Sequence, residues 1–243
     1  MANHILLVFE GEKTEKLVFQ SFKEHFLNES ENTVVYGVYC SEIYSLYHRL
    51  HKDPDLDFFF YLKEKPQNTD LLKDVKSSDV SEIYLFFDFD GHATAADDKK
   101  LQAMLEHFDE ETENGKLYIS YPMVEAIRHL STSVEFQNVV VNARNNIKYK
   151  GLVHKEGDQL LRDLSALSFS QWQYIIDEHC KKLNYLVNDV FSLPTDYISQ
   201  SSIFEIQQKK YLNSQSSVAV LSAFPIFIAD YYGYKKINEI LKK

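Results

Sequence analysis

Two apolar stretches of this chain, Ile5-Leu-Leu-Val-Phe9 and Ile83-Tyr-Leu-Phe-Phe87, decide the predicted fold. Each is a short run of β-branched, aromatic and aliphatic residues, which is typical of a strand buried on both faces of a parallel sheet. Acidic residues follow each run at once: Glu10-Gly11-Glu12 after the first and Asp88-Phe89-Asp90 after the second. Because α/β proteins bind ligands at the carboxyl ends of such strands, the sequence predicts a functional site there.

Strand-like and helix-like segments alternate through the first half of the chain. Strands are predicted at 5–10, 34–39, 82–90 and 117–121, with helices from residue 14, at 41–51, at 95–111 and after Pro122. The intervening segment 52–81 is predicted to be irregular, with a short strand at 58–62 as its one regular element. Strands separated by helices predict a parallel sheet with right-handed crossovers.

The second half is predicted to be mostly helical. Apolar residues from Trp172 to Val187 recur at helical spacing, which indicates an amphipathic helix whose stripe packs in the core. Further helices are predicted at 157–167, 201–213, 216–231 and 234–242. The predicted fold class is therefore α/β, with a parallel-sheet domain over residues 1–145 and a helical domain over 146–243.

Composition limits the classes of protein to which the chain can belong. It has 243 residues, 44% hydrophobic and 14% aromatic, which is enough for one or two globular domains. Two cysteines, Cys40 and Cys180, are too few for a disulfide framework, and no signal-peptide pattern opens the chain, so we expect a cytoplasmic protein. The longest apolar run, 218–229, is too short to cross a membrane.

Charge is unevenly distributed along the chain. Residues 1–143 hold 26 acidic and 13 basic residues, whereas residues 144–243 hold 10 acidic and 13 basic ones. A net charge of −10 argues against a protein that coats nucleic acid by charge alone. The asymmetry is either ordinary surface variation or the sign of an acidic metal-binding half joined to a half that approaches a polyanion.

The strand-end acids have the composition of a magnesium site. Asp88 and Asp90 are two residues apart at a predicted strand end, so their side chains would leave the same face and share one cation. Glu10 would lie beside them if the first and third strands are neighbours, and Glu12 and Glu15 bring further acid. Magnesium prefers oxygen ligands, and crowded carboxylates need a cation or a proton between them.

These motifs resemble the Toprim (topoisomerase–primase) domain, whose signature is a strand-end glutamate followed later by Asp-x-Asp. The form Glu10-Gly-Glu-Lys-Thr-Glu15 is similar to the small bacterial nuclease branch related to the OLD-family and RloB-like proteins. In that branch a fourth strand often ends in an Asn-Pro-x-x-Glu-like turn. Tyr121-Pro-Met-Val-Glu125 is similar to that turn, with tyrosine in place of asparagine. The resemblance covers about residues 4–130.

The resemblance implies a metal-dependent nuclease that cleaves phosphodiester bonds in DNA or RNA. Glu10, Asp88, Asp90 and Glu125 would ligate Mg²⁺ or Mn²⁺, and Glu10 could also shuttle a proton. A basic residue after the core would assist, and Lys148 and Lys150 are the candidates. Proteins of this branch act in bacterial defence against phage, often beside an ATPase partner. The sequence is compatible with either a monomer or a homo-oligomer.

Two other functions are compatible with the same residues. Phe86-Phe-Asp-Phe-Asp90-Gly91 also resembles the first motif of haloacid-dehalogenase-type phosphatases, with Asp88 as nucleophile and Asp90 as acid/base. The later acidic motif of that family would be formed by Asp158 and Asp163, with Lys150 or Lys155 as its lysine. A non-enzymatic Toprim-like sensor or partner-binding protein is the other alternative. His92 would contact a substrate phosphate in either enzyme or have no role.

Overall fold

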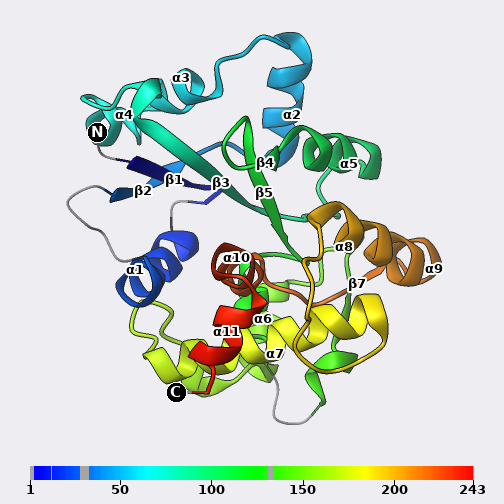
Figure 1. The fold of residues 1–243 in the computed structure, drawn as a ribbon. Helices are drawn as coiled ribbons and strands as arrows, with labels where there is room; N and C mark the ends of the chain where they lie inside the picture. Colours follow the sequence, from blue (N-terminus) through cyan, green and yellow to red (C-terminus); the bar gives the residue numbers. More distant parts are fainter. Residues whose placement is uncertain (1–2, 12, 28–32, 131–133, 243) are drawn as a thin grey trace. The chain divides into compact units, whose positions relative to one another are not determined.

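The computed structural model describes residues 3–11, 13–27, 33–130 and 134–242. The chain divides into two compact units (Figure 1). The first unit comprises Met1–Phe87 and Asp97–Leu117, and the second comprises Asp88–Ala96 and Tyr118–Lys243. These ranges differ from the predicted domains 1–145 and 146–243, whose boundary stays a prediction.

The elements of the first unit alternate between strands and helices as the sequence predicts. They are β1 (Asn3–Phe9), α1 (Thr14–Phe26), β2 (Thr33–Tyr39), α2 (Ile43–Lys52), α3 (Phe58–Lys63), α4 (Thr69–Leu72), the 3₁₀ helix η1 (Ser77–Asp79), β3 (Val80–Asp88), α5 (Asp98–His107), β4 (Asp109–Glu110) and β5 (Gly115–Ser120). The last residue of β3 and the second half of β5 are assigned to the second unit.

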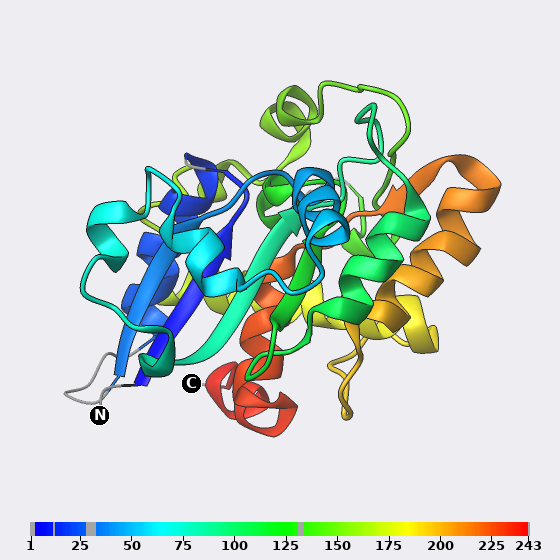
Figure 2. The ribbon, with the colours of Figure 1, turned by 90° about the horizontal axis from the view of Figure 1, so that it is seen from above.

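One mainly parallel sheet organises the strands. The five strands β2-β1-β3-β5-β4 form it in that order among the described residues. β1 pairs in parallel with β2 along its whole length and with β3 from His4 to Phe9, with a register shift between His4 and Ile5. From β1 to β2 the chain moves towards one edge of the sheet, and from β2 to β3 it moves back across β1 in the opposite direction. Right-handed crossovers therefore put α1 on one face of these strands and α2 and α3 on the other (Figure 1, Figure 2). The α/β class with a mainly parallel sheet is confirmed.

The second unit is mostly helical, with a small antiparallel sheet. Its elements are η2 (Val124–Arg128), η3 (Phe136–Asn138), β6 (Val140–Asn142), α6 (Tyr149–Glu156), η4 (Gln159–Leu161), α7 (Phe169–Asn188), α8 (Gln200–Gln207), the π-helical η5 (Gln208–Leu212), α9 (Asn213–Gln215), β7 (Ser217–Ala219), α10 (Ala223–Tyr232) and α11 (Tyr234–Ile240).

The predicted amphipathic helix around Trp172 is α7. Its N-terminus is fixed by a capping box in which Ser168 and Gln171 satisfy each other's backbone nitrogens. Trp172 and Ile176 have no exposed surface, and α10 packs against this helix. The stripe therefore belongs to the core, as expected.

Three predicted elements are wrong. The run 58–62 is helix α3, because Asp57 caps it by accepting from the Phe60 nitrogen. Only Gln159–Leu161 of the predicted helix 157–167 is helical, as a 3₁₀ turn. The segment 216–231 begins as strand β7, which pairs with β6, before α10 starts at Ala223. Short apolar runs fit either structure, and caps and long-range pairing decide between them.

Other boundaries are shifted or were not predicted. The helix after Pro122 is the 3₁₀ helix η2, and α5 spans Asp98–His107 rather than 95–111. Helix α6 and the β6–β7 pair have no counterpart in the sequence prediction.

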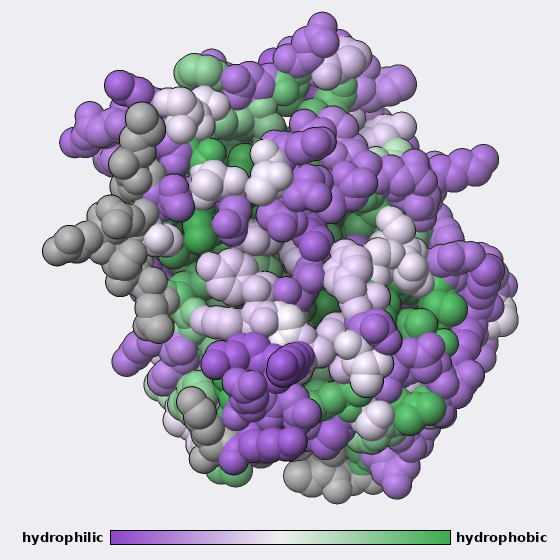
Figure 3. Space-filling view, in the orientation of Figure 1, coloured by the Kyte–Doolittle hydropathy of each residue, from purple (hydrophilic) through white to green (hydrophobic). Residues whose placement is uncertain are grey.

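No described helix has the length and apolarity that a membrane crossing requires. Hydrophilic residues cover most of the face shown in Figure 3, where apolar residues form separate patches.

Candidate active site

Glu10 follows the carboxyl end of β1. Its backbone nitrogen donates to the Phe86 carbonyl oxygen at 3.3 Å, and Phe9 is paired with Phe86. The predicted condition, that the first and third strands are parallel neighbours, is confirmed. Glu10 belongs to the first unit and Asp88 to the second, so a shared ion between their carboxylates stays a prediction.

The turn after Glu10 uses one of the predicted acids for its own structure. The Glu15 carboxylate is buried and accepts from the Gly11 nitrogen at 3.1 Å. A Cβ at position 11 would lie 2.4 Å from a Glu15 oxygen, so a larger residue there would displace the Glu15 carboxylate. Glu15 is therefore a cap of this turn. Glu12 lies outside the described residues.

Asp88 and Asp90 flank a buried anchor in the second unit. β3 ends at Asp88, two residues earlier than predicted, and Asp90 lies in a turn with φ 42°. The Phe89 ring between them is fully buried, and the Phe89 nitrogen donates to the Ser120 carbonyl oxygen at 3.0 Å. Both aspartates are half-buried. Phe89 thus fixes where the two carboxylates leave the strand end.

Glu125 is a buried carboxylate that the fold satisfies only in part. It lies in η2, three residues after the cis peptide bond Tyr121–Pro122. Its side chain is 4% exposed, and Oε1 lies 3.3 Å from Nζ of Lys150, which is 65% exposed. Oε2 has no hydrogen-bond partner among the residues that the structure describes. A buried polar atom left in this way costs stability, and Oε2 is an acceptor that a ligand would satisfy.

A pocket of about 310 Å³ in the second unit collects several predicted residues. Asp90, His92, Lys148 and Lys150 line it together with Tyr149. Lys148 and Lys150 are exposed, and they lie at the start of α6 on either side of the buried Tyr149. Such a pocket is suited to a metal-bridged phosphate, because the carboxylate can ligate the metal ion and the two ammonium groups can bind the phosphate oxygens.

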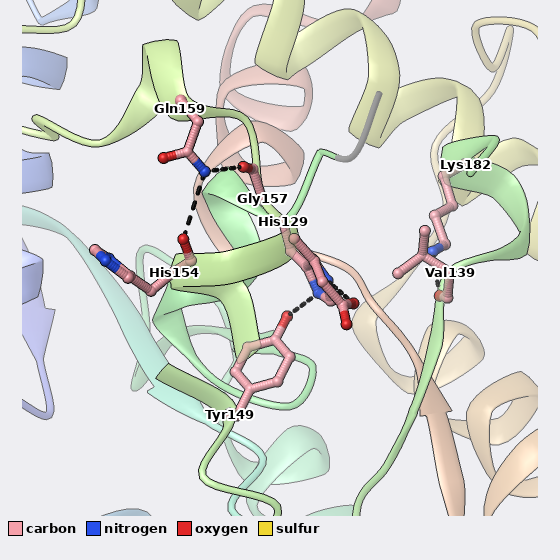
Figure 4. Close-up of polar contacts among 8 residues, drawn as sticks. His129, Val139, Tyr149, His154, Gly157, Gln159 and Lys182 are labelled. Carbon is pink, nitrogen blue, oxygen red and sulfur yellow. Dashed lines mark hydrogen bonds and ion pairs between the residues drawn. The ribbon is translucent and has the colours of Figure 1, made fainter. Parts of the chain in front are cut away.

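The sequence did not predict the roles of Tyr149 and His129. The Tyr149 hydroxyl lies 2.9 Å from His129 Nδ1, and His129 Nε2 lies 3.7 Å from the Glu156 carboxylate (Figure 4). Burial, and then the charges of Glu125 and Asp88, raise the pKa of Tyr149 well above its usual value. Burial lowers the pKa of His129. The one sequence signal was the position of Tyr149 between the two candidate lysines.

The donor types in this region fit a hard divalent cation. Carboxylate oxygens are available from Asp88, Asp90 and Glu125. Oε2 of Glu125 is an unsatisfied acceptor to which a cation would bind. Within residues 3–11, 13–27, 33–130 and 134–242, no three histidine, cysteine, aspartate or glutamate side chains converge as a ready metal site. The region therefore has the donor types that a divalent cation needs, but the described side chains do not form a preassembled site.

The residues of the phosphatase alternative have other local roles. Asp158 follows helix α6 and caps η4 by accepting from the Leu160 nitrogen. Asp163 is bonded to both the nitrogen and the hydroxyl of Ser165. Neither acid follows a strand, whereas the later phosphatase motif is expected at a strand end. The local structure therefore does not favour this alternative.

Comparison with known proteins adds no relative. No protein-family model, no curated protein and no solved structure matches this chain. The Toprim resemblance accordingly rests on the short motifs around Glu10, Asp88 and Glu125.

Proposed function

We propose that this protein is a divalent-metal-dependent nuclease that cleaves phosphodiester bonds in DNA or RNA. The observation that supports the proposal best is the mixture of charges in the second unit. Asp90, Lys148 and Lys150 line one pocket, and Lys150 is paired with the buried Glu125. Acids alone would fit a structural cation, but acids with lysines suit a cation and a phosphate together.

The residues divide into metal ligands and phosphate ligands. Asp88, Asp90 and Glu125 would hold Mg²⁺ or Mn²⁺, with Glu10 contributing from the end of β1. The bound ion supplies Lewis-acid chemistry and a water of lowered pKa. Lys148 and Lys150 would bind the oxygens of the scissile phosphate, and Lys150 would exchange its contact with Glu125 for one with the phosphate. Glu10 would hold or accept a proton of the attacking water.

The cellular role is proposed from the same resemblance. Small proteins of this Toprim branch act in bacterial defence against phage, often with an ATPase partner. Cys40 and Cys180 are both buried free thiols, as a cytoplasmic protein would have. The proposed activity is compatible with either a monomer or a homo-oligomer.

A cleavage assay on plasmid DNA and transfer RNA tests the proposal. With Mg²⁺ or Mn²⁺ the protein should cut one of them internally, and a chelator should stop it. Glu10→Gln and Asp88→Asn should each reduce cutting by at least about a hundredfold, because both would serve the same transition state. Glu15→Gln is the matched control, since its carboxylate caps the turn at Gly11 and should keep most of the activity.

A chromogenic phosphomonoester separates the enzyme classes. Hydrolysis of the monoester that survives Glu10→Gln but not Asp88→Asn would contradict the nuclease proposal and favour a phospho-aspartate mechanism. Cutting that persists in both variants would place the activity elsewhere. Cutting that appears only when an ATPase partner is added would retain the proposal and identify its activator.

A further inference from the structure

We infer that the first unit holds a binding site for a nucleoside phosphate at the carboxyl ends of β1 and β2. A pocket of about 640 Å³ lies there, lined by residues of β1, α1, β2 and the segment 67–71. This volume is within the range of small-molecule sites, roughly 300–1,000 Å³. The pocket shares no lining residue with the pocket around Asp90. The inference does not depend on the nuclease proposal.

The floor of this pocket is aromatic and held in place by close packing. The Phe9 and Phe19 rings lie 5.5 Å apart between centroids and are tilted against each other. A Cβ at Gly37 would come within 2.7 Å of the Phe19 ring, so glycine on β2 lets α1 approach closely. Phe9 is buried and supports the half-buried Phe19 ring, whose exposed part offers stacking surface for a planar ligand.

One wall is fixed by Asn68. Its buried amide accepts from the Tyr39 nitrogen and donates to the carbonyl oxygens of Tyr39 and Leu62, each at 2.8 Å. These three bonds hold the segment from Gln67 to Leu71 against the end of β2. Because the wall is formed before any ligand arrives, binding would cost little ordering of the protein.

The rim has the polar groups that a nucleoside phosphate requires. Lys16 is exposed, lines the pocket and makes no ion pair or hydrogen bond with any described residue. Its ammonium would bind the phosphate. The exposed amides of Gln20 and Gln67 would bind the polar edge of the base, and Asp70 would accept from the ribose hydroxyls.

The combination decides the class of ligand. An aromatic floor alone would fit any planar or apolar molecule, and one lysine alone would fit any anion. A planar ring joined to an anionic group through a hydroxylated linker uses the floor, the lysine, the amides and the acid together. A nucleoside monophosphate has this arrangement and a size that suits the pocket.

Calorimetric titration of the full chain tests the inference. Adenosine and guanosine 5′-monophosphate are the probes, with adenosine and ribose 5-phosphate as partial ligands, all in excess chelator so that metal-dependent cleavage does not contribute. One of the two nucleotides should bind with 1:1 stoichiometry and a Kd in the micromolar to low millimolar range. Both partial ligands should bind at least tenfold more weakly.

Variants assign the binding to the pocket. Lys16→Ala should weaken nucleotide binding about tenfold but leave adenosine binding unchanged, and Gln67→Ala should weaken both. Lys99→Ala, at an exposed lysine of α5 in the same unit, is the matched control and should bind as the unmodified protein does. Melting temperatures should agree among all four proteins, because Lys16 and Gln67 are exposed.

Three results would overturn the inference. The first is no saturable binding of either nucleotide at 5 mM. The second is equal affinity for ribose 5-phosphate, which would indicate a general anion site. The third is unchanged nucleotide affinity in both Lys16→Ala and Gln67→Ala, which would place binding elsewhere. Loss of metal-dependent cleavage has no bearing on this test, so the two proposals can fail separately.

Discussion

Asn68 in the first unit and Glu125 in the second are both buried polar side chains, but the fold treats them differently. Asn68 makes three hydrogen bonds of 2.8 Å to backbone groups. Glu125 has one ion pair, with an exposed lysine, and its other oxygen has no hydrogen-bond partner among the described residues. The difference teaches that the fold uses Asn68 for its own stability, whereas it leaves one oxygen of Glu125 as an unused acceptor, as the proposed metal site requires.

The largest effect on stability is expected at Asn68. Asn68→Ala should lower the free energy of unfolding by about 3 kcal/mol, because it leaves backbone groups of Tyr39 and Leu62 without their partner. Urea denaturation measures the change. Asn145→Ala removes an exposed asparagine and should cost less than about 0.5 kcal/mol. If Asn68→Ala and Asn145→Ala lowered the free energy of unfolding equally, Asn68 would not be a stabilising residue and would not differ from Glu125 in this respect.

The next effect is the pH dependence caused by His179. This fully buried histidine accepts from the Ser222 nitrogen, and its Nε2 atom has no hydrogen-bond partner in the described part of the chain. Burial first, and then the nearby Lys182 charge, lower the pKa of His179 from 6.5 to about 3. The unfolded chain therefore binds a proton below about pH 6.5 that the folded chain refuses until about pH 3.

Stability should accordingly be complete above pH 6.5 and fall as the pH is lowered from 6.5 towards 3. Between pH 7 and pH 5 the loss from His179 is about 2 kcal/mol. His179→Gln keeps an acceptor for Ser222 and should flatten this decline, while His154→Gln, at an exposed histidine, should not. A decline that is the same in all three proteins would show that other groups, such as His129, cause it.

The smallest effect on stability is expected at Glu125 itself. Glu125→Gln removes a charge from a buried site and should change the free energy of unfolding by less than about 1 kcal/mol, in either direction. The same variant should lose metal-dependent cleavage. Glu205→Gln, at an exposed acid of α8, should leave both properties unchanged. A strongly destabilised Glu125→Gln would mean that the pair with Lys150 is structural.

The sequence predicted the part of the fold that depends on local pattern. The continuous apolar runs before Glu10 and Asp88 identify strands β1 and β3, since such runs are typical of buried parallel strands. The helical stripe of α7 was equally clear from Trp172 onward. The acids at the two strand ends were found for the same reason, because a change from apolar to acidic residues marks where a strand ends.

The remaining features depend on partners far apart in the sequence. Asn68 bonds to Tyr39, 29 residues away, and His129 bonds to Tyr149, 20 residues away. No local pattern marks such pairs, so the wall of the first pocket and the roles of Tyr149 and His129 required the structure. Glu15 shows the converse error: it belongs to the predicted acidic motif, but its carboxylate is bonded to Gly11.

The most direct test of the central claim is the binding of Mn²⁺ by the full chain, measured by calorimetry with the melting temperature as a second readout. The unmodified protein and Glu15→Gln should bind Mn²⁺ saturably and melt at a higher temperature with 5 mM Mn²⁺ than with chelator. Asp88→Asn should bind at least tenfold more weakly and lose most of that increase. Equal melting temperatures with Mn²⁺ and with chelator, together with no saturable binding, would contradict a metal-dependent active site.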